Sequence, residues 1–317
     1  MQDSSIWTEK FRPKGFEEFK GQEKIIERVS SMVKNRNIQN MLFSGPPGVG
    51  KTTLALIIAY KLYGDSWRQN MLELNASDNR GIDVVRTIIK DFARTKAIGT
   101  DLPKIILLDE CDALTSEAQH ALRRTMEDFS NTSRFILSCN YSSKIIEPIQ
   151  SRCAVFRFKL LNKKELEEII DNIAKKEKIK VENDAFNALF DVSEGDVRKM
   201  INIIQSCSSV SKAITEKLIY ELVSSAQPKE IKEILDTSLK GEFIKARERL
   251  LETMLKHGLS GLDIIKQIQK EVWNLKISDE NKIKLIDKCG EIEFRLVEGS
   301  DEFIQLEALL ANFVGLR

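Results

Sequence analysis

The stretch Gly45-Pro46-Pro47-Gly48-Val49-Gly50-Lys51-Thr52 decides the fold of the first half of this chain. It follows the apolar run Met41-Leu42-Phe43 and precedes the helix-forming run at 54–59. A glycine-rich loop between a strand and a helix satisfies the GxxxxGK[ST] pattern together with the context that the pattern requires. Its glycines let backbone N–H groups curl around phosphates, and the helix N-terminus adds positive potential. The sequence therefore predicts a nucleotide-binding loop rather than a plain glycine turn.

Two side chains of this loop have distinct expected roles. Lys51 should reach the β- and γ-phosphates of ATP, and Thr52 should ligate Mg²⁺. The residues expected to bind the nucleotide in this stretch are Gly45, Pro46, Pro47, Gly48, Val49, Gly50, Lys51, Thr52 and Thr53.

A second apolar run ends in two carboxylates, in Ile105-Ile106-Leu107-Leu108-Asp109-Glu110. A metal site at the carboxyl edge of a parallel sheet requires such an ending. Asp109 is expected to hold Mg²⁺, directly or through water. Glu110 is then placed to orient and deprotonate the attacking water, which predicts a hydrolysing ATPase rather than a nucleotide binder alone. Without the upstream loop, the same run could be an ordinary surface strand end.

Three more polar residues lie next to the ends of predicted strands or helices. Asn140 ends the run 134–140 and could fix the water or the γ-phosphate, although without context it could be a turn residue. Arg152 precedes the next strand, and Arg198 lies at a probable helix start; both are candidates for contacting developing phosphate charge. From position alone, an arginine is more commonly a surface salt-bridge residue.

The order of apolar runs predicts three domains. Short runs alternate with amphipathic stretches between residues 40 and 160, which is typical of a parallel sheet with crossover helices. From about 162 the strand-like runs stop, and Asn162 can cap a helix. We expect an α/β ATPase domain at 1–161, a small helical lid domain at 162–226 and an all-helical C-terminal domain at 227–317, whose apolar stripes are core faces with room for an interface.

Composition narrows the class of protein. The chain has 317 residues, and its 49 Lys+Arg against 48 Asp+Glu give a formal net charge of +1, which argues against a polybasic tail protein. No apolar run reaches the roughly 18 residues of a membrane span, and the N-terminus lacks the pattern of a signal peptide. We therefore expect an intracellular, soluble protein without membrane partners. Five scattered cysteines and two isolated histidines make a disulfide framework, a zinc site or a histidine-based site improbable.

Together these motifs resemble the small subunits of replication factor C, the archaeal and eukaryotic sliding-clamp loader within the AAA+ ATPases, over essentially the whole chain. The resemblance rests on Trp7-Thr8-Glu9-Lys10-Phe11-Arg12-Pro13, the phosphate loop, Leu74-Asn75-Ala76-Ser77-Asp78, Asp109-Glu110-Cys111-Asp112, Ser138-Cys139-Asn140-Tyr141, Ser151-Arg152-Cys153 and Gly195-Asp196-Val197-Arg198. Several of these motifs are peculiar to clamp loaders. The chief departure is Cys111, where the family usually has Ala.

The resemblance assigns roles to the arginines and to Asn140. Asn140 would be the first sensor and Arg198 the second, whereas Arg152 would act in trans on ATP held by a neighbouring subunit. Arg12 would close over the nucleotide. Since Arg152 of a neighbouring subunit would reach the γ-phosphate only in a correctly packed ring, hydrolysis would depend on assembly.

The resemblance also implies partners. Arg80, Arg86 and Lys144 would bind backbone phosphates of primer-template DNA, although solvated surface charge remains the alternative. Arg80 and Arg86 would not share a face on one continuous helix, so we expect Arg80 to precede the helix. The C-terminal domain would form an oligomerising collar with the large subunit and other small subunits, and the assembly would load a sliding clamp. The location would be cytoplasmic in an archaeon, which we favour, or nuclear in a eukaryote.

Regional charge agrees with that division. Residues 1–160 contain 24 basic and 19 acidic residues, or +5, whereas 161–225 contain 10 and 12, and 226–317 contain 15 and 17, or −2 each. A modestly basic first domain is expected if DNA meets only this part of the chain.

Two other functions remain open from the residues. Another AAA+ DNA motor, such as a branch-migration helicase or an origin-recognition ATPase, would use the same ATP site. An initiator should carry a winged helix, but 226–317 shows no β-wing pattern. A purely structural ring subunit would bind nucleotide without hydrolysing it, and the presence of Lys51, Asp109, Glu110 and Arg152 argues against it.

Overall fold

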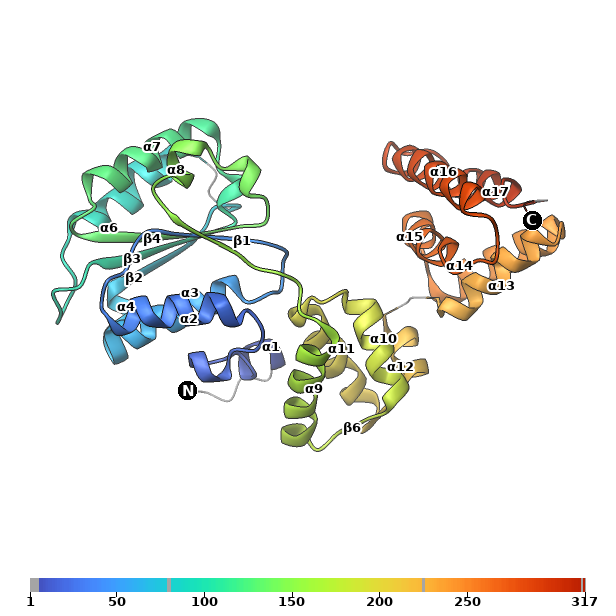
Figure 1. Cartoon of the computed structure of the whole chain (residues 1–317), viewed down its shortest axis with the longest axis horizontal. Helices are drawn as coiled ribbons and strands as arrows, with labels where there is room; N and C mark the ends of the chain where they lie inside the picture. Colours follow the sequence, from blue (N-terminus) through green and yellow to red (C-terminus); the bar gives the residue numbers. More distant parts are fainter. Residues whose placement is uncertain (1–5, 79–80, 224–225, 315, 317) are drawn as a thin grey trace. The chain divides into compact units, whose positions relative to one another are not determined.

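A computed structural model describes residues 6–78, 81–223, 226–314 and 316. The chain forms two compact units (Figure 1). The first comprises Met1–Lys180 and Leu189–Gln205, and the second comprises Val181–Ala188 and Ser206–Arg317. We refer to them as the N-terminal and C-terminal units and describe each by itself.

A five-stranded parallel sheet organises the N-terminal unit. Its strands are β1 (Met41–Ser44), β2 (Met71–Asn75), β3 (Lys104–Asp109), β4 (Ser133–Cys139) and β5 (Ala154–Arg157), in the order β2-β3-β4-β1-β5. All pairs are parallel. This confirms the parallel α/β sheet that the alternation of apolar runs predicts. The central strands are mostly buried, which explains why each contains an uninterrupted apolar run of three or four residues.

Helices connect and cover these strands. They are α1 (Trp7–Lys10), η1 (Phe16–Glu18), α2 (Glu23–Lys34), α3 (Lys51–Tyr63), η2 (Gly64–Ser66), α4 (Trp67–Asn70), α5 (Ile82–Val84), the π-helical segment η3 (Val85–Ile89), α6 (Lys90–Arg94), η4 (Cys111–Ala113), α7 (Ser116–Asp128), η5 (Ser142–Lys144), α8 (Glu147–Gln150) and α9 (Lys163–Glu177). Asn162 caps α9 through a capping box with Glu165, as its sequence position predicts. Thr115 caps α7 through its hydroxyl.

The helices lie in layers on the sheet. Figure 1 shows α2 and α3 together on one face and α6, α7 and α8 on the other. Beneath α7, Leu122 and Met126 pack with Phe135 and Leu137 of β4 in one buried cluster. Burial of side chains of this size stabilises the layer by about 1.5–3 kcal/mol each.

Strand register decides where the functional groups meet. Asn75 at the end of β2 lies opposite Asp109 at the end of β3, and Ser44 at the end of β1 lies opposite Cys139 of β4. Because parallel strands share one direction, the loops that follow them emerge at the same edge of the sheet. The phosphate loop, the Asp109-Glu110 pair and Asn140 are therefore neighbours.

The C-terminal unit is mostly helical. Its elements include β7 (Ala213–Ile214), α12 (Glu216–Leu222), α13 (Pro228–Leu239), α14 (Phe243–His257), α15 (Gly261–Val272), α16 (Asp279–Val297) and α17 (Glu302–Ala311). Three further elements, β6 (Lys180–Val181), α10 (Asn183–Ser193) and α11 (Val197–Val210), span residues of both units. The strand pair β6-β7 is an addition to the helices expected after residue 162. Strands of two residues have no alternation that a sequence pattern could reveal.

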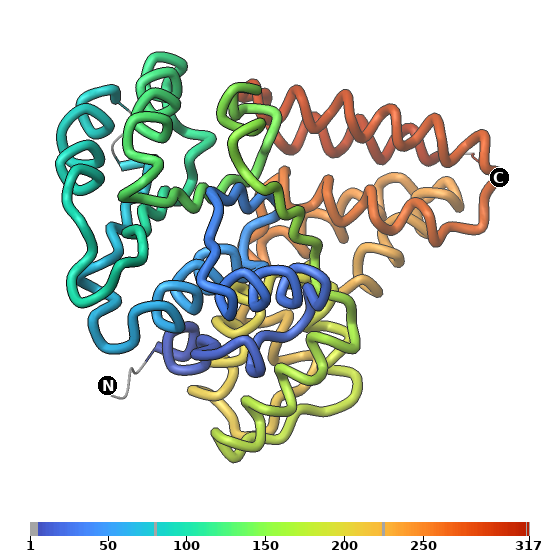
Figure 2. Tube along the Cα trace, turned by 60° about the vertical axis from the view of Figure 1, so that its left-hand side comes forward, coloured from blue at the N-terminus to red at the C-terminus, as the bar shows by residue number. Residues whose placement is uncertain are grey.

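Aliphatic packing and local caps stabilise helices α13 to α17. Ile234, Leu250, Ile268 and Leu309 belong to one buried cluster. Figure 2 shows α16 and α17 (red) running side by side, and they are in contact. The helix starts are capped by side chains of Ser260, Ser278 and Asp301. No helix in the described part of the chain is long and apolar enough to span a membrane.

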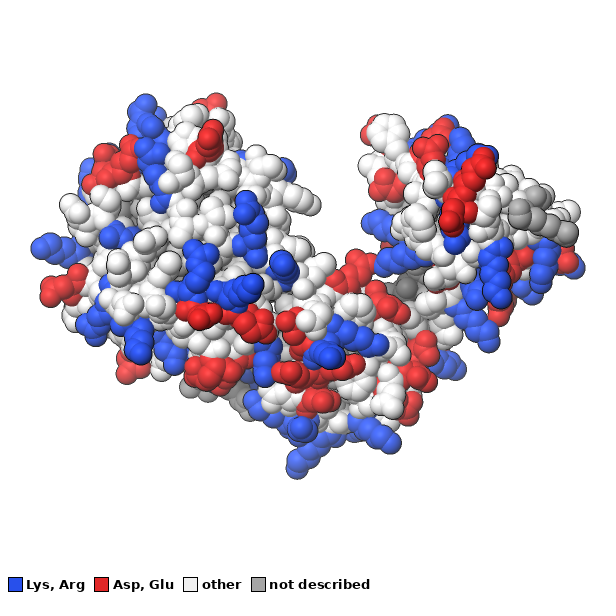
Figure 3. Space-filling view, viewed as in Figure 1, with Lys and Arg blue, Asp and Glu red and all other residues white. Residues whose placement is uncertain are grey.

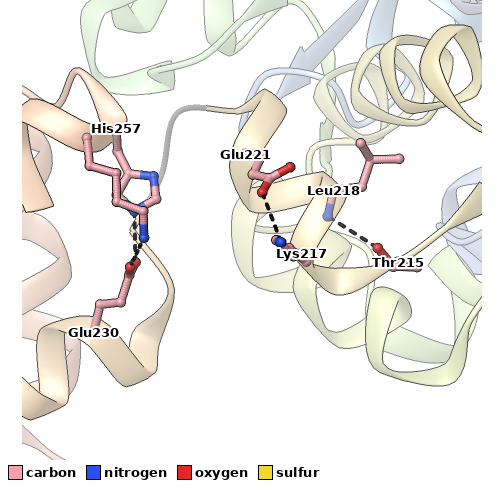
Figure 4. A network of polar contacts seen from close by, with 7 residues as sticks. Thr215, Lys217, Leu218, Glu221, Glu230 and His257 are labelled. Carbon is pink, nitrogen blue, oxygen red and sulfur yellow. Dashed lines mark hydrogen bonds and ion pairs between the residues drawn. The ribbon is translucent and has the colours of Figure 1, made fainter.

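One ionic network joins two of these helices (Figure 4). The carboxylate of Glu230, near the start of α13, contacts Lys256 Nζ at 2.7 Å and His257 Nε2 at 2.9 Å, and it also accepts from the backbone N–H of Gln227 at 3.0 Å. Burial alone would raise the pKa of Glu230, but Lys256, the Gln227 N–H and His257 together lower it. Glu230 thus ties the first turn of α13 to the last turn of α14.

Candidate nucleotide site

The phosphate loop connects β1 to α3 in a conformation that depends on glycine. Gly50 has φ +94° and forms the N-cap of α3, so the helix begins directly at Lys51. A Cβ on Gly50 would lie 2.5 Å from the ring of Phe19, which leaves no room for a side chain. The loop therefore presents backbone N–H groups at a helix start, the arrangement that favours phosphate.

Lys51 is buried within this loop. Its side chain is 8% exposed, and Nζ donates to the carbonyl oxygens of Gly45 at 2.6 Å and Pro46 at 2.7 Å and to Asn140 Oδ1 at 3.0 Å. Burial lowers the pKa of Lys51, and the carboxylate of Asp109 opposes this shift. All three hydrogen-bond acceptors are neutral oxygens, so no salt bridge has to break before the ammonium group can contact a phosphate.

Thr52 and Asp109 meet at the end of β3. The Thr52 hydroxyl donates to Asp109 Oδ2, while Asp109 Oδ1 accepts from the backbone N–H of Glu110 at 3.0 Å. Oxygen ligands of this kind suit Mg²⁺, which binds through one or two protein groups, water and phosphate rather than in an all-protein cage. Among the described residues, no three His, Cys, Asp or Glu side chains gather into a metal site of their own. The pair therefore fits Mg²⁺ that arrives with a nucleotide.

Glu110 has an unusual backbone. Its φ of +51° places a non-glycine residue in the left-handed region, directly after the last residue of β3, and its side chain is exposed. Such a conformation costs about 1–3 kcal/mol and persists only where the surrounding structure enforces it, and it is common at active sites. The turn sends the chain into η4 while leaving the Glu110 carboxylate at the sheet edge.

Asn140 is held by a braced loop. Its amide oxygen accepts from Lys51, and the segment that follows is fixed by two glutamines. Gln119 of α7 donates to the Lys144 carbonyl at 3.0 Å and accepts from the Ile146 N–H at 2.9 Å. Gln150 donates to the carbonyls of Ser142 and Ile145. The order of this loop therefore depends on α7 and α8.

A cavity of about 390 Å³ lies over the phosphate loop. Its lining includes the expected residues Arg12, Pro47, Gly48, Val49, Gly50, Lys51, Thr52, Thr53, Asp109, Glu110, Asn140 and Arg198. Gly45 and Pro46 complete the loop and contribute carbonyls to Lys51. Of the predicted nucleotide residues of this chain, all but Gly45, Pro46 and Arg152 thus line the cavity.

Arg12 reaches this cavity from the N-terminal segment. Its guanidinium pairs with Glu9 at 2.6 Å. Burial raises the pKa of Glu73 on β2, and the charge of Arg12 opposes the shift, so Arg12 also lies near the edge strand of the sheet. The cation therefore lies beside carboxylates of its own chain.

Other lining residues were not expected to bind the nucleotide, although some of them belong to the motifs at 7–13 and 195–198 that carry the resemblance. They come from the N-terminal segment, α9 and the first turns of α11: Thr8, Glu9, Lys10, Phe11, Pro13, Lys14, Glu18, Phe19, Lys20, Leu161, Glu168, Ile169, Asn172, Ile173, Lys176, Val197 and Ile201. On α9, Ile169, Ile173 and Lys176 follow three- and four-residue spacing, which on sequence alone is indistinguishable from an ordinary core face.

Arg152 lies outside the cavity of its own chain. Its side chain is exposed and pairs with Glu127 Oε1 of α7 at 2.5 Å, and it donates to the Pro148 carbonyl at 2.7 Å. Arg123 lies 3.8 Å from the same Glu127 oxygen. No sequence pattern indicates Glu127, because nothing local links it to a residue 25 positions away.

Arg86 and Lys144, two of the predicted DNA contacts, lie on short helical segments. Arg86 is exposed within the π-helical segment η3, and π-turns are frequent at functional sites. Lys144 is exposed at the end of η5, with Nζ 5.2 Å from the ring centroid of Tyr141. Helix α5 begins at Ile82. Arg80 lies outside the described residues.

Two buried thiols flank the catalytic candidates. Cys111 follows Glu110 and Cys139 precedes Asn140, and their side chains share a hydrogen bond. This hydrogen bond and burial both raise the pKa of Cys111. The same bond lowers the pKa of Cys139. Cys111 thus occupies a buried position in which a small side chain packs between strand ends.

Comparison with known families finds two matching models. "ATPase family associated with various cellular activities (AAA)" matches residues 41–160, and "Replication factor C C-terminal domain" matches 226–312. A curated replication factor C small subunit of Methanococcus maripaludis is 54% identical over 306 residues, covering 96% of this chain and 97% of that relative. The small subunit of Archaeoglobus fulgidus is 50% identical over 311 residues, covering 98% of each.

The fold is also similar to a solved structure. The Holliday junction branch migration motor RuvB of Thermotoga maritima superimposes with a TM-score of 0.57 at 23% identity, over 72% of this chain and 78% of that one. At this identity the likeness concerns the fold alone.

Proposed function

Because this chain belongs to the replication factor C small-subunit family, we propose that it is an ATP-hydrolysing subunit of a complex that opens a sliding clamp and loads it onto primer-template DNA. The observation that carries the proposal is the gathering of Lys51, Thr52, Asp109 and Arg198 around one cavity over the phosphate loop. The domain division proposed is 1–161 for the ATPase, 162–226 for the lid and 227–317 for the collar. The cytoplasm is the proposed location.

The proposed chemistry is hydrolysis of the γ-phosphate of ATP. Lys51 and the loop N–H groups bind the phosphates, and Thr52 and Asp109 hold Mg²⁺, which when bound neutralises phosphate charge. Glu110 accepts a proton from water as its oxygen attacks the γ-phosphorus, and ADP leaves. Asn140, already bonded to Lys51, orients the γ-phosphate or the water.

Arg198 and Arg152 serve different sites in this proposal. Arg198 lines the cavity of its own chain, whereas Arg152 is exposed and outside it, which suits a contact with ATP on a neighbouring copy or relative. In the separate chain, Glu127 and the Pro148 carbonyl hold the Arg152 guanidinium. Arg86 and Lys144 would bind DNA phosphates, as would Arg80.

Steady-state ATP turnover by the assembled complex tests the proposal. We expect turnover to rise when primed DNA and clamp are both present. Lys51→Ala and Glu110→Gln should each lower it by about 10²-fold or more, since one removes phosphate binding and the other the general base. Lys34→Ala and Glu117→Gln change residues outside the cavity and serve as controls.

Two results would contradict the proposal. Turnover unaffected by Lys51→Ala or Glu110→Gln would show that this cavity is not the site of hydrolysis. A chain that purifies as a lone hexamer and unwinds DNA, without a larger related ATPase or a clamp, would favour a DNA motor instead.

A further inference from the structure

A carboxylate lies directly against the phosphate loop. Gly48 has φ +71°, and a Cβ built on it would lie 1.8 Å from Asp196 Oδ1 and 2.2 Å from its Cγ. The Asp196 side chain therefore occupies the space that any side chain at position 48 would need. No other residue type fits at Gly48 without displacing Asp196.

The same oxygen caps a helix. Asp196 immediately precedes α11, and its Oδ1 accepts from the backbone N–H of Lys199 at 2.9 Å. The Asp196 carbonyl accepts from the Met200 N–H at 3.0 Å. Side-chain capping of this kind stabilises a helix start by satisfying a free N–H group. The Asp196 side chain thus caps the first turn of α11 and also contacts the phosphate loop.

The turn before Asp196 is also constrained. Glu194 and Gly195 are both left-handed, with φ +55° and +86°, and a Cβ on Gly195 would lie 3.0 Å from Leu160 Cβ. Consecutive left-handed residues leave the chain little freedom in direction. The start of α11 is therefore set by this turn on one side and by Gly48 on the other.

Arg198 is two residues further along, in that first turn. Arg198 and Val197 both line the cavity, and the positive charge of Arg198 is close enough to Lys51 to change its pKa. Burial is the main cause that lowers the pKa of Lys51, and Arg198 lowers it further. A guanidinium near the phosphate lysine can contact the outermost phosphate only if the helix start keeps its position.

We propose that Asp196 is a positioning residue that docks the first turn of α11 on Gly48 and thereby holds Arg198 over the γ-phosphate. The inference rests on the proposed function, because Arg198 is taken to bind phosphate. Asp196 itself is not among the residues that line the cavity. Its loss should therefore weaken the preference for a triphosphate over a diphosphate, while the loop still binds the phosphates that both nucleotides share.

Equilibrium affinities of the full chain for ATPγS and ADP test this inference. We expect Arg198→Ala to reduce the ratio of the ADP to the ATPγS dissociation constant by about tenfold, the value of one charge-assisted hydrogen bond. Asp196→Ala should reduce the ratio by a similar factor. The double variant should differ little from either single variant, because both changes act through one contact.

Three further variants separate positioning from helix capping. Asp196→Ser keeps a capping oxygen but is too short to cap and also reach Gly48, so the ratio should still fall while the melting temperature is retained. Asp196→Asn keeps both contacts and should restore the ratio. Thr215→Ala removes the cap of α12, outside the cavity, and should affect stability but not the ratio.

The outcomes distinguish this inference from the proposed function. An unchanged ratio in Asp196→Ala and Asp196→Ser, with a reduced one in Arg198→Ala, overturns the positioning role alone. An unchanged ratio in Arg198→Ala overturns both the role of Arg198 and this inference. If the double variant reduced the ratio by the product of the two single reductions, the positioning role would also be contradicted, since Asp196 would then act independently of Arg198.

Discussion

The two units differ in which polar side chains they bury and in how many large apolar side chains they expose. In the N-terminal unit, Lys51, Lys104 and Gln119 are buried, and each has hydrogen-bond partners. In the C-terminal unit, exposed large apolar side chains are more numerous than in the N-terminal unit, with eleven described residues against six, and Leu255 at 80% and Phe294 at 65% are examples. The described exposed apolar residues of that unit are Val210, Leu222, Ile244, Leu255, Trp273, Ile283, Phe294, Val297, Phe303, Ile304 and Val314.

This difference agrees with the proposed division of the chain into a catalytic part and an assembling part. Burying a polar group is costly unless its hydrogen bonds are made, and of these three buried residues only Lys51 lines the cavity. Exposed apolar side chains in a group mark an interaction surface. On α16, Ile283, Phe294 and Val297 are spaced 11 and 3 residues apart, which places them on one side of the helix. On the face in Figure 3, charges of both signs are interspersed among uncharged residues.

The largest expected effect is on hydrolysis within an assembled complex. Arg152→Ala in one subunit of a mixed complex should leave ATP binding by that subunit intact and lower hydrolysis at the adjacent site by about 10³-fold or more, since it removes charge stabilisation of the transferring phosphoryl group. Single-turnover hydrolysis in assemblies with one labelled site measures this. Arg157→Ala, an exposed arginine on β5, is the control. Normal hydrolysis at the neighbour would rule out a finger in trans.

The next effect is on subunit association, with ATP binding unchanged. Phe294→Glu places a charge in the exposed apolar stripe of α16 and should weaken subunit association by about tenfold or more, because burying an unpaired charge is unfavourable. ATP binding by the separate chain should not change. Sedimentation and nucleotide titration measure the two properties, with Glu293→Gln on the same helix as control. Association equal to that of the unchanged chain would mean that the stripe is not an interface.

DNA affinity should respond more weakly. Lys144→Ala and Arg86→Ala should each reduce affinity and lower the slope of log affinity against log salt by about 0.9 for each DNA phosphate that is no longer neutralised, since fewer counterions are released. Fluorescence anisotropy at several salt concentrations measures the slope. Lys164→Ala, a change at an exposed residue of α9, should leave it unchanged. An unaltered slope in both variants would mean that Arg86 and Lys144 are solvated surface residues that do not contact DNA.

The smallest effect concerns the stability of helices α13 and α14. Glu230→Gln should lower the free energy of unfolding by about 1 kcal/mol, because it weakens a cap and an ion pair that is partly exposed. The pKa of Glu230 is lowered in the folded chain, so its contribution is present above the unfolded pKa and is lost as pH falls through the folded one. Urea unfolding at neutral and acidic pH measures both. Glu233→Gln is the control, and an equal loss at every pH would contradict the ionic explanation.

Sequence patterns predicted the parts of this fold that are encoded locally. The strand 105–109 and the loop at 45–52 lie where the patterns place them, and Asn162 caps α9. The patterns missed what depends on packing between distant segments. Glu127 contacts Arg152 only because α7 lies beside α8, and Asp196 contacts Gly48 only because the α11 start meets the phosphate loop.

The strand order has a consequence for synthesis on the ribosome. Met41 of β1 pairs with Ile136 of β4 and with Ala154 of β5, so the strand that carries the phosphate loop stays unpaired until most of the first unit has been made. Helices α13, α15 and α16 instead begin with caps a few residues away. Local contacts form quickly, and distant ones form slowly. A nascent chain therefore has its catalytic strand exposed during most of translation of the first unit, when a chaperone would be of most use.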